Sequence, residues 1–193
     1  MTNETLVRRI VETALLRGRF ELRSGRISSY YLDKYLFETQ PDILAELGRR
    51  LAAHVGAATT RVAGAELGGI PLVTATAMAA NRPAVLIRNQ KKDYGTSKLI
   101  EGTLEQGDRV MIVEDVATSG GQVLEAARTL EEAGSTVEKI VAVIDREEGA
   151  RANIETAGFP FASLLTRSDL GIPGEGEEDT ASAGPGAGGT GSA

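Results

Sequence analysis

The chain has 193 residues and a formal net charge of −6, which allows one folded domain with a small appendage and argues against nucleic acid as the main partner. It contains no cysteine and one histidine, His54, so disulfides, thiolate metal sites and multi-histidine metal sites are excluded. No stretch is apolar enough for a signal peptide or a membrane span, and we therefore expect a cytoplasmic protein without a membrane partner.

The first 40 residues are expected to form a unit of their own. Apolar residues at helical spacing predict a helix over residues 4–17, capped by Asn3 and ended by Gly18. Residues 20–37 are typical of short extended pieces around a turn at residues 24–25.

Residues 41–170 are expected to form the core domain, and residues 171–193 a disordered tail rich in Gly, Ala, Ser and acids. Strands are predicted at residues 62–65, 84–87, 110–113, 140–144 and 161–165. Helices are predicted from residue 41 onward and over residues 71–80, 122–133 and 148–157. Residues 89–103 are expected to form a long polar loop. This alternation predicts an α/β fold class, with a mostly parallel central sheet flanked by helices.

The segment from Val110 to Ala126 has the pattern of a phosphate-binding site. A buried strand is followed by two acids, then by a loop of small and hydroxyl residues, and then by a helix. In a parallel sheet such a loop lies at the carboxyl end of a strand, where ligands bind. Glycines let the backbone approach a ligand closely, and free amides at a helix start favour an anion.

Glu114 and Asp115 distinguish this segment from the common nucleotide loops, whose GxxxxGK[ST] and GxGxxG patterns are absent. Acids beside an anion site would repel phosphate, unless they bind sugar hydroxyls or a magnesium ion through water. The pattern therefore indicates a sugar phosphate. The alternative is an ordinary strand–turn–helix with two solvated acids.

A second candidate feature is the basic loop that follows the strand at 84–87. It carries Arg88, Lys91, Lys92 and Lys98, with glycines near both ends. Because it starts at the same sheet edge as the phosphate-binding segment, we interpret it as a lid over that site. The alternative is a solvated surface loop, as most charge runs are.

The strand, acid pair and Gly-Gly loop of the phosphate-binding segment resemble the signature of type I phosphoribosyltransferases. The resemblance implies that Glu114 and Asp115 hold the ribose hydroxyls and that residues 117–122 wrap the 5-phosphate. The residues implied to bind phosphoribosyl pyrophosphate are Arg88, Asn89, Lys92, Tyr94, Glu114, Asp115, Val116, Ala117, Thr118, Ser119, Gly120, Gly121 and Gln122.

The basic loop is similar to that of the orotate phosphoribosyltransferase family through Arg88, Lys92, Gly95 and residues 100–102. Asn89 stands where the family has a second basic residue, and Tyr94 where it usually has histidine. The resemblance implies that Lys92 and Arg88 act in catalysis with Asp115. It also implies a homodimer in which loop 88–102 completes the neighbouring site.

Three further segments resemble the same family. Residues 20–31 match its hood over the base, with Arg23 where a lysine is common, and residues 64–71 match its pyrophosphate-side turn, with Gly68 where some members have lysine. Arg146 is implied to grip the orotate carboxylate, and Thr118 and Arg23 also to contact orotate. Without the resemblance, Arg146 is a surface residue paired with Glu147 or Glu148.

The resemblance as a whole implies transfer of a phosphoribosyl group to orotate in pyrimidine biosynthesis, giving orotidine 5-monophosphate and pyrophosphate. Mg²⁺ is the implied cofactor, held mainly through substrate and water with no direct protein ligand. Two alternatives stay open: a phosphoribosyltransferase for another base, and a non-catalytic regulator that senses nucleotides on the same fold. The departures at Asn89, Gly68 and Tyr94 keep the second alternative open.

Overall fold

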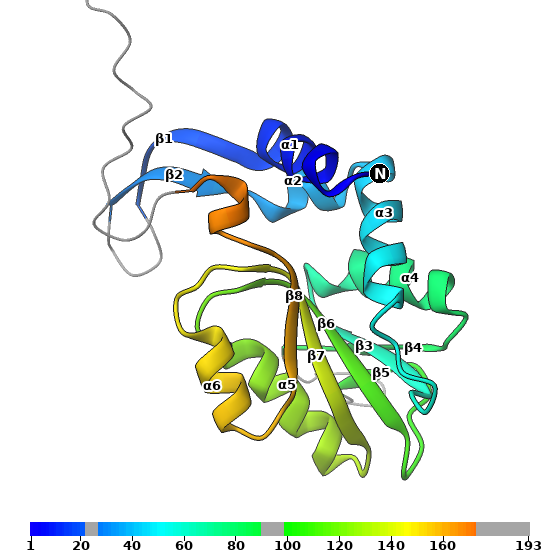
Figure 1. Ribbon diagram of the computed structural model, residues 1–193. Coiled ribbons are helices and arrows are strands. Elements are labelled where there is room, and N and C mark those ends of the chain that lie inside the picture. Colours follow the sequence, from blue (N-terminus) through cyan, green and yellow to red (C-terminus); the bar gives the residue numbers. More distant parts are fainter. Residues whose placement is uncertain (22–26, 90–98, 173–193) are drawn as a thin grey trace, which may run out of the picture.

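The computed structural model describes residues 1–21, 27–89 and 99–172 (Figure 1). Its central sheet has six strands in the order β5-β4-β3-β6-β7-β8. The bounds are β3 Arg61–Ala65, β4 Ala84–Ile87, β5 Ile100–Glu101, β6 Arg109–Ala117, β7 Thr136–Asp145 and β8 Phe161–Thr166. All neighbouring strands of this sheet pair in parallel except β4 and β5. The predicted mostly parallel sheet is therefore confirmed.

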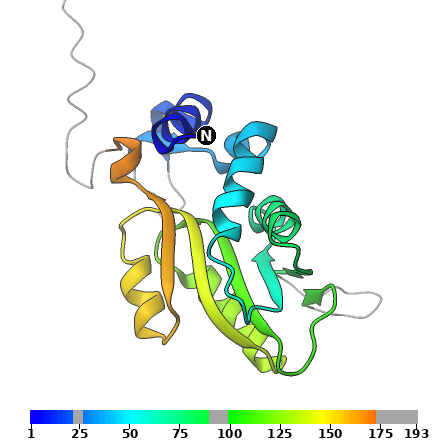
Figure 2. The same ribbon diagram turned by 45° about the vertical axis from the view of Figure 1, so that its right-hand side comes forward.

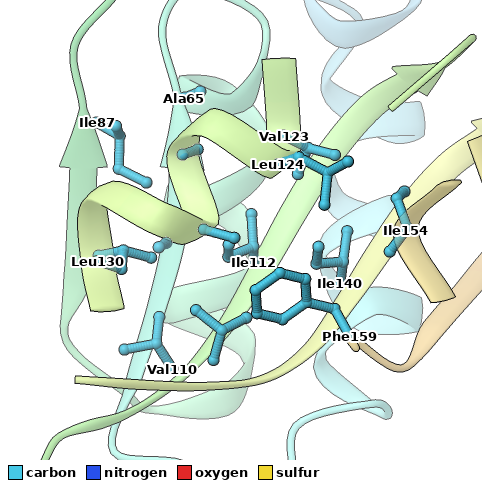
Figure 3. Packing of buried hydrophobic residues seen from close by; sticks show 14 of the residues in the cluster. Ala65, Ile87, Val110, Ile112, Val123, Leu124, Leu130, Ile140, Ile154 and Phe159 are labelled. Atoms are coloured by element: carbon cyan, nitrogen blue, oxygen red, sulfur yellow. The ribbon is translucent and has the colours of Figure 1, made fainter. Parts of the chain in front are cut away.

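Helices cover both faces of the sheet, as Figures 1 and 2 show. On one face lie α3 (Pro41–Ala52) and α4 (Gly69–Ala80), and on the other α5 (Gly121–Glu132) and α6 (Ala150–Thr156). Strand β6 contributes to both cores because successive side chains alternate between faces. Val110 and Ile112 pack under α5 (Figure 3), while Met111 and Val113 join the cluster under α3 and α4.

The connections reverse direction between β3 and β6. The chain leaves β3 through α4 toward β4, whereas it leaves β6 through α5 toward β7 on the other side. A reversal of this kind opens a crevice at the carboxyl ends of the two strands, which is where open α/β sheets bind ligands. The fold therefore directs attention to the turns that follow Ala65 and Ala117.

An N-terminal layer, described for residues 3–21 and 27–38, lies over this end of the sheet (Figure 1). It consists of α1 (Asn3–Ala14), the antiparallel strands β1 (Leu15–Glu21) and β2 (Ile27–Leu32), and α2 (Lys34–Glu38). Three predictions were wrong in detail. The cap of the first helix is Thr2 and not Asn3, since the Thr2 hydroxyl accepts from the Thr5 amide. The helix expected to run to residue 17 ends at Ala14, because Leu15 pairs with Leu32 in the hairpin. Part of the extended segment is the helix α2, capped by Asp33.

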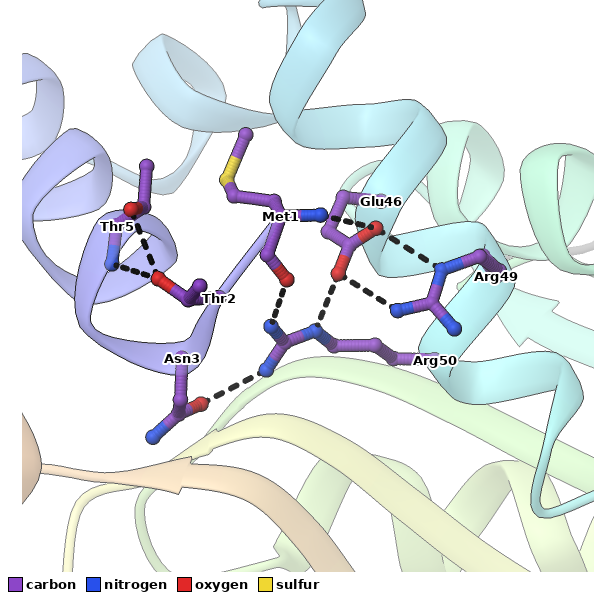
Figure 4. A network of polar contacts seen from close by, with 7 residues as sticks. All are labelled: Met1, Thr2, Asn3, Thr5, Glu46, Arg49 and Arg50. Atoms are coloured by element: carbon purple, nitrogen blue, oxygen red, sulfur yellow. Dashed lines mark hydrogen bonds and ion pairs between the residues drawn. The ribbon is translucent and has the colours of Figure 1, made fainter.

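Glu46 of α3 ties the N-terminal layer to the core (Figure 4). Its carboxylate lies 2.8 Å from both Arg49 and Arg50, and 3.6 Å from the Met1 amine. Arg50 in turn donates to Asn3 at 2.7 Å and to the Met1 carbonyl. Hydrogen bonds from Arg49 and Arg50, which outweigh burial, lower the pKa of Glu46 to about 2.

The described C-terminal end passes the predicted start of the tail. After β8 comes the short helix η1 (Ser168–Leu170), and then Ile172, which is 7% exposed and packs with Leu170 in the α3-side core. The boundary predicted at residue 171 is therefore too early by at least two residues. None of the helices in the described ranges is both long and apolar enough to cross a membrane.

Candidate active site

The loop after β6 forms a cavity of about 400 Å³ at the start of α5. Its lining consists of Glu114, Val116, Ala117, Thr118, Ser119, Gly120, Gly121, Gln122 and Val123. All of these residues except Val123 are among those that the resemblance implies to bind phosphoribosyl pyrophosphate. Asp115 is the one residue of the segment 114–122 that does not line the cavity. The first amides of a helix have no intrahelical partner, so the start of α5 offers hydrogen-bond donors and a positive dipole end to an anion.

Gly120 makes this loop possible for two reasons. Its φ of +80° is a left-handed conformation that only glycine adopts without cost, and an added Cβ would fall 2.9 Å from Ile154 Cγ1 of α6. Helix α6 also fixes the loop from outside, because Asn153 Nδ2 donates to the Ser119 carbonyl at 2.9 Å and the Ala150 amide to the Thr118 carbonyl at 3.1 Å. The loop is therefore held in place before any ligand binds.

The acid pair lies within β6 rather than after it, since β6 pairs with β7 as far as Ala117. Both acids are buried: Glu114 is 8% exposed and Asp115 is 3% exposed, which contradicts the alternative of two solvated acids. Burial, the Asp115 charge and a hydrogen bond with Asp115 raise the pKa of Glu114. A protonated Glu114 repels phosphate less than a carboxylate would.

Besides the hydrogen bond with Glu114, Asp115 has two partners among the described residues. Its Oδ2 pairs with the Lys34 ammonium of α2 at 2.5 Å, and its Oδ1 accepts from the Val116 amide. Glu38, also in α2, is 1% exposed, and burial and the Asp115 charge raise its pKa to about 8. The sequence predictions missed both Lys34 and Glu38, which lie seven residues or fewer beyond the segment matched to the hood.

A hydrogen-bonded bridge joins the carboxyl ends of β3, β4 and β6. The Asn89 amide donates to Glu66 Oε1 at 2.8 Å, and the Asn89 side chain donates to the Glu66 carbonyl at 3.1 Å. Gln122 Nε2 reaches Asn89 Oδ1 at 3.3 Å, and Arg88 Nη1 lies 3.8 Å from the Glu66 carboxylate. The structure thus brings together Arg88, Asn89 and Gln122, which the resemblance implies to bind phosphoribosyl pyrophosphate, and adds Glu66.

Arg146 follows β7 and lies beside the loop after β6, since its amide donates to the Ala117 carbonyl at 2.9 Å. Its guanidinium pairs with Glu148 at 2.8 Å and lies 3.4 Å from the Tyr30 hydroxyl of β2. The pairing with Glu148 is the one expected of a surface arginine. Tyr30 places the N-terminal layer against the same guanidinium, and its role was not predicted.

Three predicted site residues, Arg23, Lys92 and Tyr94, lie outside the described residues. The same is true of the turn at residues 24–25 and of most of loop 88–102, for which the structure describes Arg88, Asn89 and residues 99–102.

These features define a class of protein. It has a mostly parallel α/β sheet, an anion-binding loop and an acid pair after or within β6, and the turn after β3 opposite them, at the place where the strand connections reverse direction. The profile of the phosphoribosyl transferase domain matches residues 37–162, and the chain belongs to that family. The family predicted from the motifs is therefore confirmed.

Relatives narrow the class to orotate phosphoribosyltransferases. The curated protein of that name from Natronomonas pharaonis is 43% identical, over 88% of this chain and 98% of its own. The orotate phosphoribosyltransferase from Methanocella arvoryzae is 45% identical, over 86% of this chain and 95% of its own. The crystal structure of the Mycobacterium tuberculosis orotate phosphoribosyltransferase has a TM-score of 0.77 at 34% identity, and the match covers 87% of this chain and 98% of that chain.

Proposed function

We propose that the protein catalyses transfer of the phosphoribosyl group from phosphoribosyl pyrophosphate to orotate, as a step of pyrimidine biosynthesis. The observation that carries this proposal is the convergence of the phosphate loop, the acid pair and Arg146 at one end of the sheet. The relatives named above support it. So does the Mycobacterium tuberculosis orotate phosphoribosyltransferase solved with phosphoribosyl pyrophosphate, at 32% identity and a TM-score of 0.73.

In this reaction a ring nitrogen of orotate forms a bond to C1 of the ribose while the bond from C1 to the pyrophosphate oxygen breaks. The electron pair of that bond leaves with pyrophosphate, so positive charge develops on the sugar and negative charge on the leaving group. No protein nucleophile is required. The protein contributes position and charge, which are large terms in catalysis of this kind.

Each part of the site has a role in the proposal. The amides and hydroxyls of residues 117–122 bind the 5-phosphate, and Glu114, which lines the same cavity, faces the ribose hydroxyls with Asp115 beside it. Arg146 binds the orotate carboxylate in exchange for Glu148, with the Tyr30 hydroxyl at its side. Arg88 and Lys92 balance the charge of pyrophosphate, and Thr118 and Arg23 contact the base.

Mg²⁺ suits the donors present at this site. Glu114 offers a hard oxygen ligand in the lining of the cavity, with Asp115 next to it in β6. Mg²⁺ usually keeps several waters and binds through one or two carboxylates together with substrate phosphates. We propose that the ion is held mainly by the pyrophosphate and by water, with these acids nearby. When bound, it neutralises charge on the leaving group.

A homodimer in which loop 88–102 completes the neighbouring site is also part of the proposal. Helix α4 supports it, because its sequence, GIPLVTATAMAA, contains no charged residue. Its outer face includes Met78, which is 79% exposed, and Leu67 just before the helix is 65% exposed. An uncharged, partly apolar face of this kind is typical of a protein–protein interface.

A cytoplasmic location of the protein remains a prediction.

The test of the proposed function is turnover with orotate, uracil, adenine and hypoxanthine, each supplied with phosphoribosyl pyrophosphate and Mg²⁺. The proposal predicts pyrophosphate release with orotate far above that with the other three bases. Preference for another base, or binding without turnover, would contradict it and would support one of the two alternatives above.

A further inference from the structure

Lys34 is the one residue of the N-terminal layer that forms an ion pair with the acid pair of β6 in the described part of the chain. Its Nζ lies 2.5 Å from Asp115 Oδ2, with side-chain exposures of 32% for Lys34 and 4% for Asp115. Burial lowers the pKa of Lys34, but the adjacent Asp115 carboxylate more than offsets this, so the net direction is upward. The ammonium is therefore charged at neutral pH and partly accessible from the site.

The turn after β3 is built around this ion pair. Gly68 has φ −64° and ψ −31°, a conformation open to any residue, so its backbone does not require glycine. The space around Gly68 does require glycine, because an added Cβ would fall 1.7 Å from Asp115 Oδ2 and 3.1 Å from Lys34 Nζ. Lys34 and Asp115 thus occupy the volume that a side chain at position 68 would need, and the positive charge over this turn comes from α2.

The surroundings of Lys34 are strongly acidic. Glu38, Glu114 and Asp115 all act on one another electrostatically, and Lys34 opposes the upward pKa shifts of both glutamates. Both carboxyl oxygens of Glu38 are buried and have no hydrogen-bond partner among the described residues. Without the ammonium, a substrate with a pyrophosphate group would approach the Asp115 carboxylate and the two buried glutamates with no cation between them. Coulomb's law makes the repulsion from the Asp115 charge stronger at low dielectric.

We propose that Lys34 is a positioning residue of the phosphoribosyl site, which fixes the Asp115 carboxylate and supplies the positive charge that the turn at Gly68 cannot carry. The proposal rests on the proposed function, since it assigns Lys34 to the phosphoribosyl pyrophosphate side of the reaction. It predicts that Lys34 governs binding of this substrate and leaves binding of orotate nearly unchanged.

The experiment compares Lys34→Met with Lys34→Arg and with the control Lys139→Met, which removes a lysine near the opposite end of β7. Calorimetry gives the Kd for phosphoribosyl pyrophosphate with Mg²⁺, kinetics give KM for each substrate, and thermal melting checks folding. Lys34→Met should raise Kd and KM for phosphoribosyl pyrophosphate about tenfold or more, equivalent to about 1.4 kcal/mol. KM for orotate should change by less than about threefold, Lys34→Arg should recover most of the loss, and Lys139→Met should match the wild type.

Unchanged affinity in Lys34→Met, or equal loss for both substrates, would overturn the proposal. A wild-type protein that neither binds phosphoribosyl pyrophosphate nor turns over orotate would instead contradict the proposed function, so the two failures are distinguishable.

A second variant covers the case in which Lys34→Met fails to fold. Lys34→Gln keeps a polar side chain beside Asp115 but removes the positive charge. We expect it to fold like the wild type and to lose affinity for phosphoribosyl pyrophosphate as Lys34→Met does. A folded Lys34→Gln with wild-type affinity would contradict the charge role.

Discussion

Replacing Gly120 with alanine should damage both stability and activity. At φ +80°, a residue other than glycine costs about 1–2 kcal/mol. The new Cβ would also lie 2.9 Å from Ile154 Cγ1 and 3.1 Å from its Cδ1, and Ile154 is fully buried, so overpacking adds about 1–2 kcal/mol. The free energy of unfolding should fall by about 2–4 kcal/mol. If the loop moves by about 1 Å to relieve the contact, turnover should fall on the order of 100-fold.

Gly107→Ala is the matched control, because Gly107 has φ +85° but no atom within 4 Å of an added Cβ. It should lose only the backbone cost of about 1–2 kcal/mol and keep its KM for phosphoribosyl pyrophosphate. Urea denaturation and initial-rate kinetics on both variants provide the comparison. Equal losses of stability and equal activity in the two variants would refute the idea that Gly120 shapes the anion loop against α6.

Three further predictions concern other parts of the molecule. The pKa of Glu46 is lowered to about 2 from its ordinary value of 4.5, so its contribution to stability is complete above about pH 4.5 and is lost as pH falls through about 2. Glu46→Gln should therefore lower the free energy of unfolding at pH 7 by about 2 kcal/mol and flatten its acid dependence, as urea titrations would show. A chain ending at Ile172 should melt like the full chain, whereas one ending at Arg167 should melt lower because it loses the buried Ile172; equal melting of the two would contradict the observed packing. Lys92→Ala and Asp115→Asn should each abolish turnover. If subunits exchange freely in a two-fold dimer, a mixture of the two variants should recover roughly a quarter of wild-type activity. No recovery despite subunit exchange would exclude a shared site.

Much of the fold could be predicted from the sequence because its signals are local. Strand β4 has the predicted bounds, Ala84–Ile87, since a short apolar run ends at an arginine. The errors occur where pairing with a strand that is distant in sequence sets the bounds of an element. Strand β6 continues through the acid pair because β7 provides pairing as far as Asp145. Strand β5, near the end of the predicted polar loop, exists only through its pairing with β4.

The site was predictable to the extent that it is contiguous in sequence. The segment from Glu114 to Gln122 runs from the end of β6 through the following loop to the start of α5 and forms one cavity wall, so its pattern shows in a single stretch. The ion pair of Lys34 with Asp115 joins residues 81 positions apart, and a lone lysine in the segment YLDKYLF carries no signal of it. The contact of Tyr30 with Arg146 is hidden for the same reason.

The most direct measurement of the central claim is the ratio of kcat/KM for orotate to that for uracil, in the wild type and in Arg146→Met. Uracil is orotate without its carboxylate, so the ratio isolates recognition of that group. A charge-assisted pairing with Arg146 should give the wild type a strong preference for orotate, and its loss should reduce the ratio about 10- to 100-fold, equivalent to about 1.5–3 kcal/mol. KM for phosphoribosyl pyrophosphate should stay close to that of the wild type. A ratio that is the same in both proteins would contradict the assignment of this end of the sheet as an orotate site.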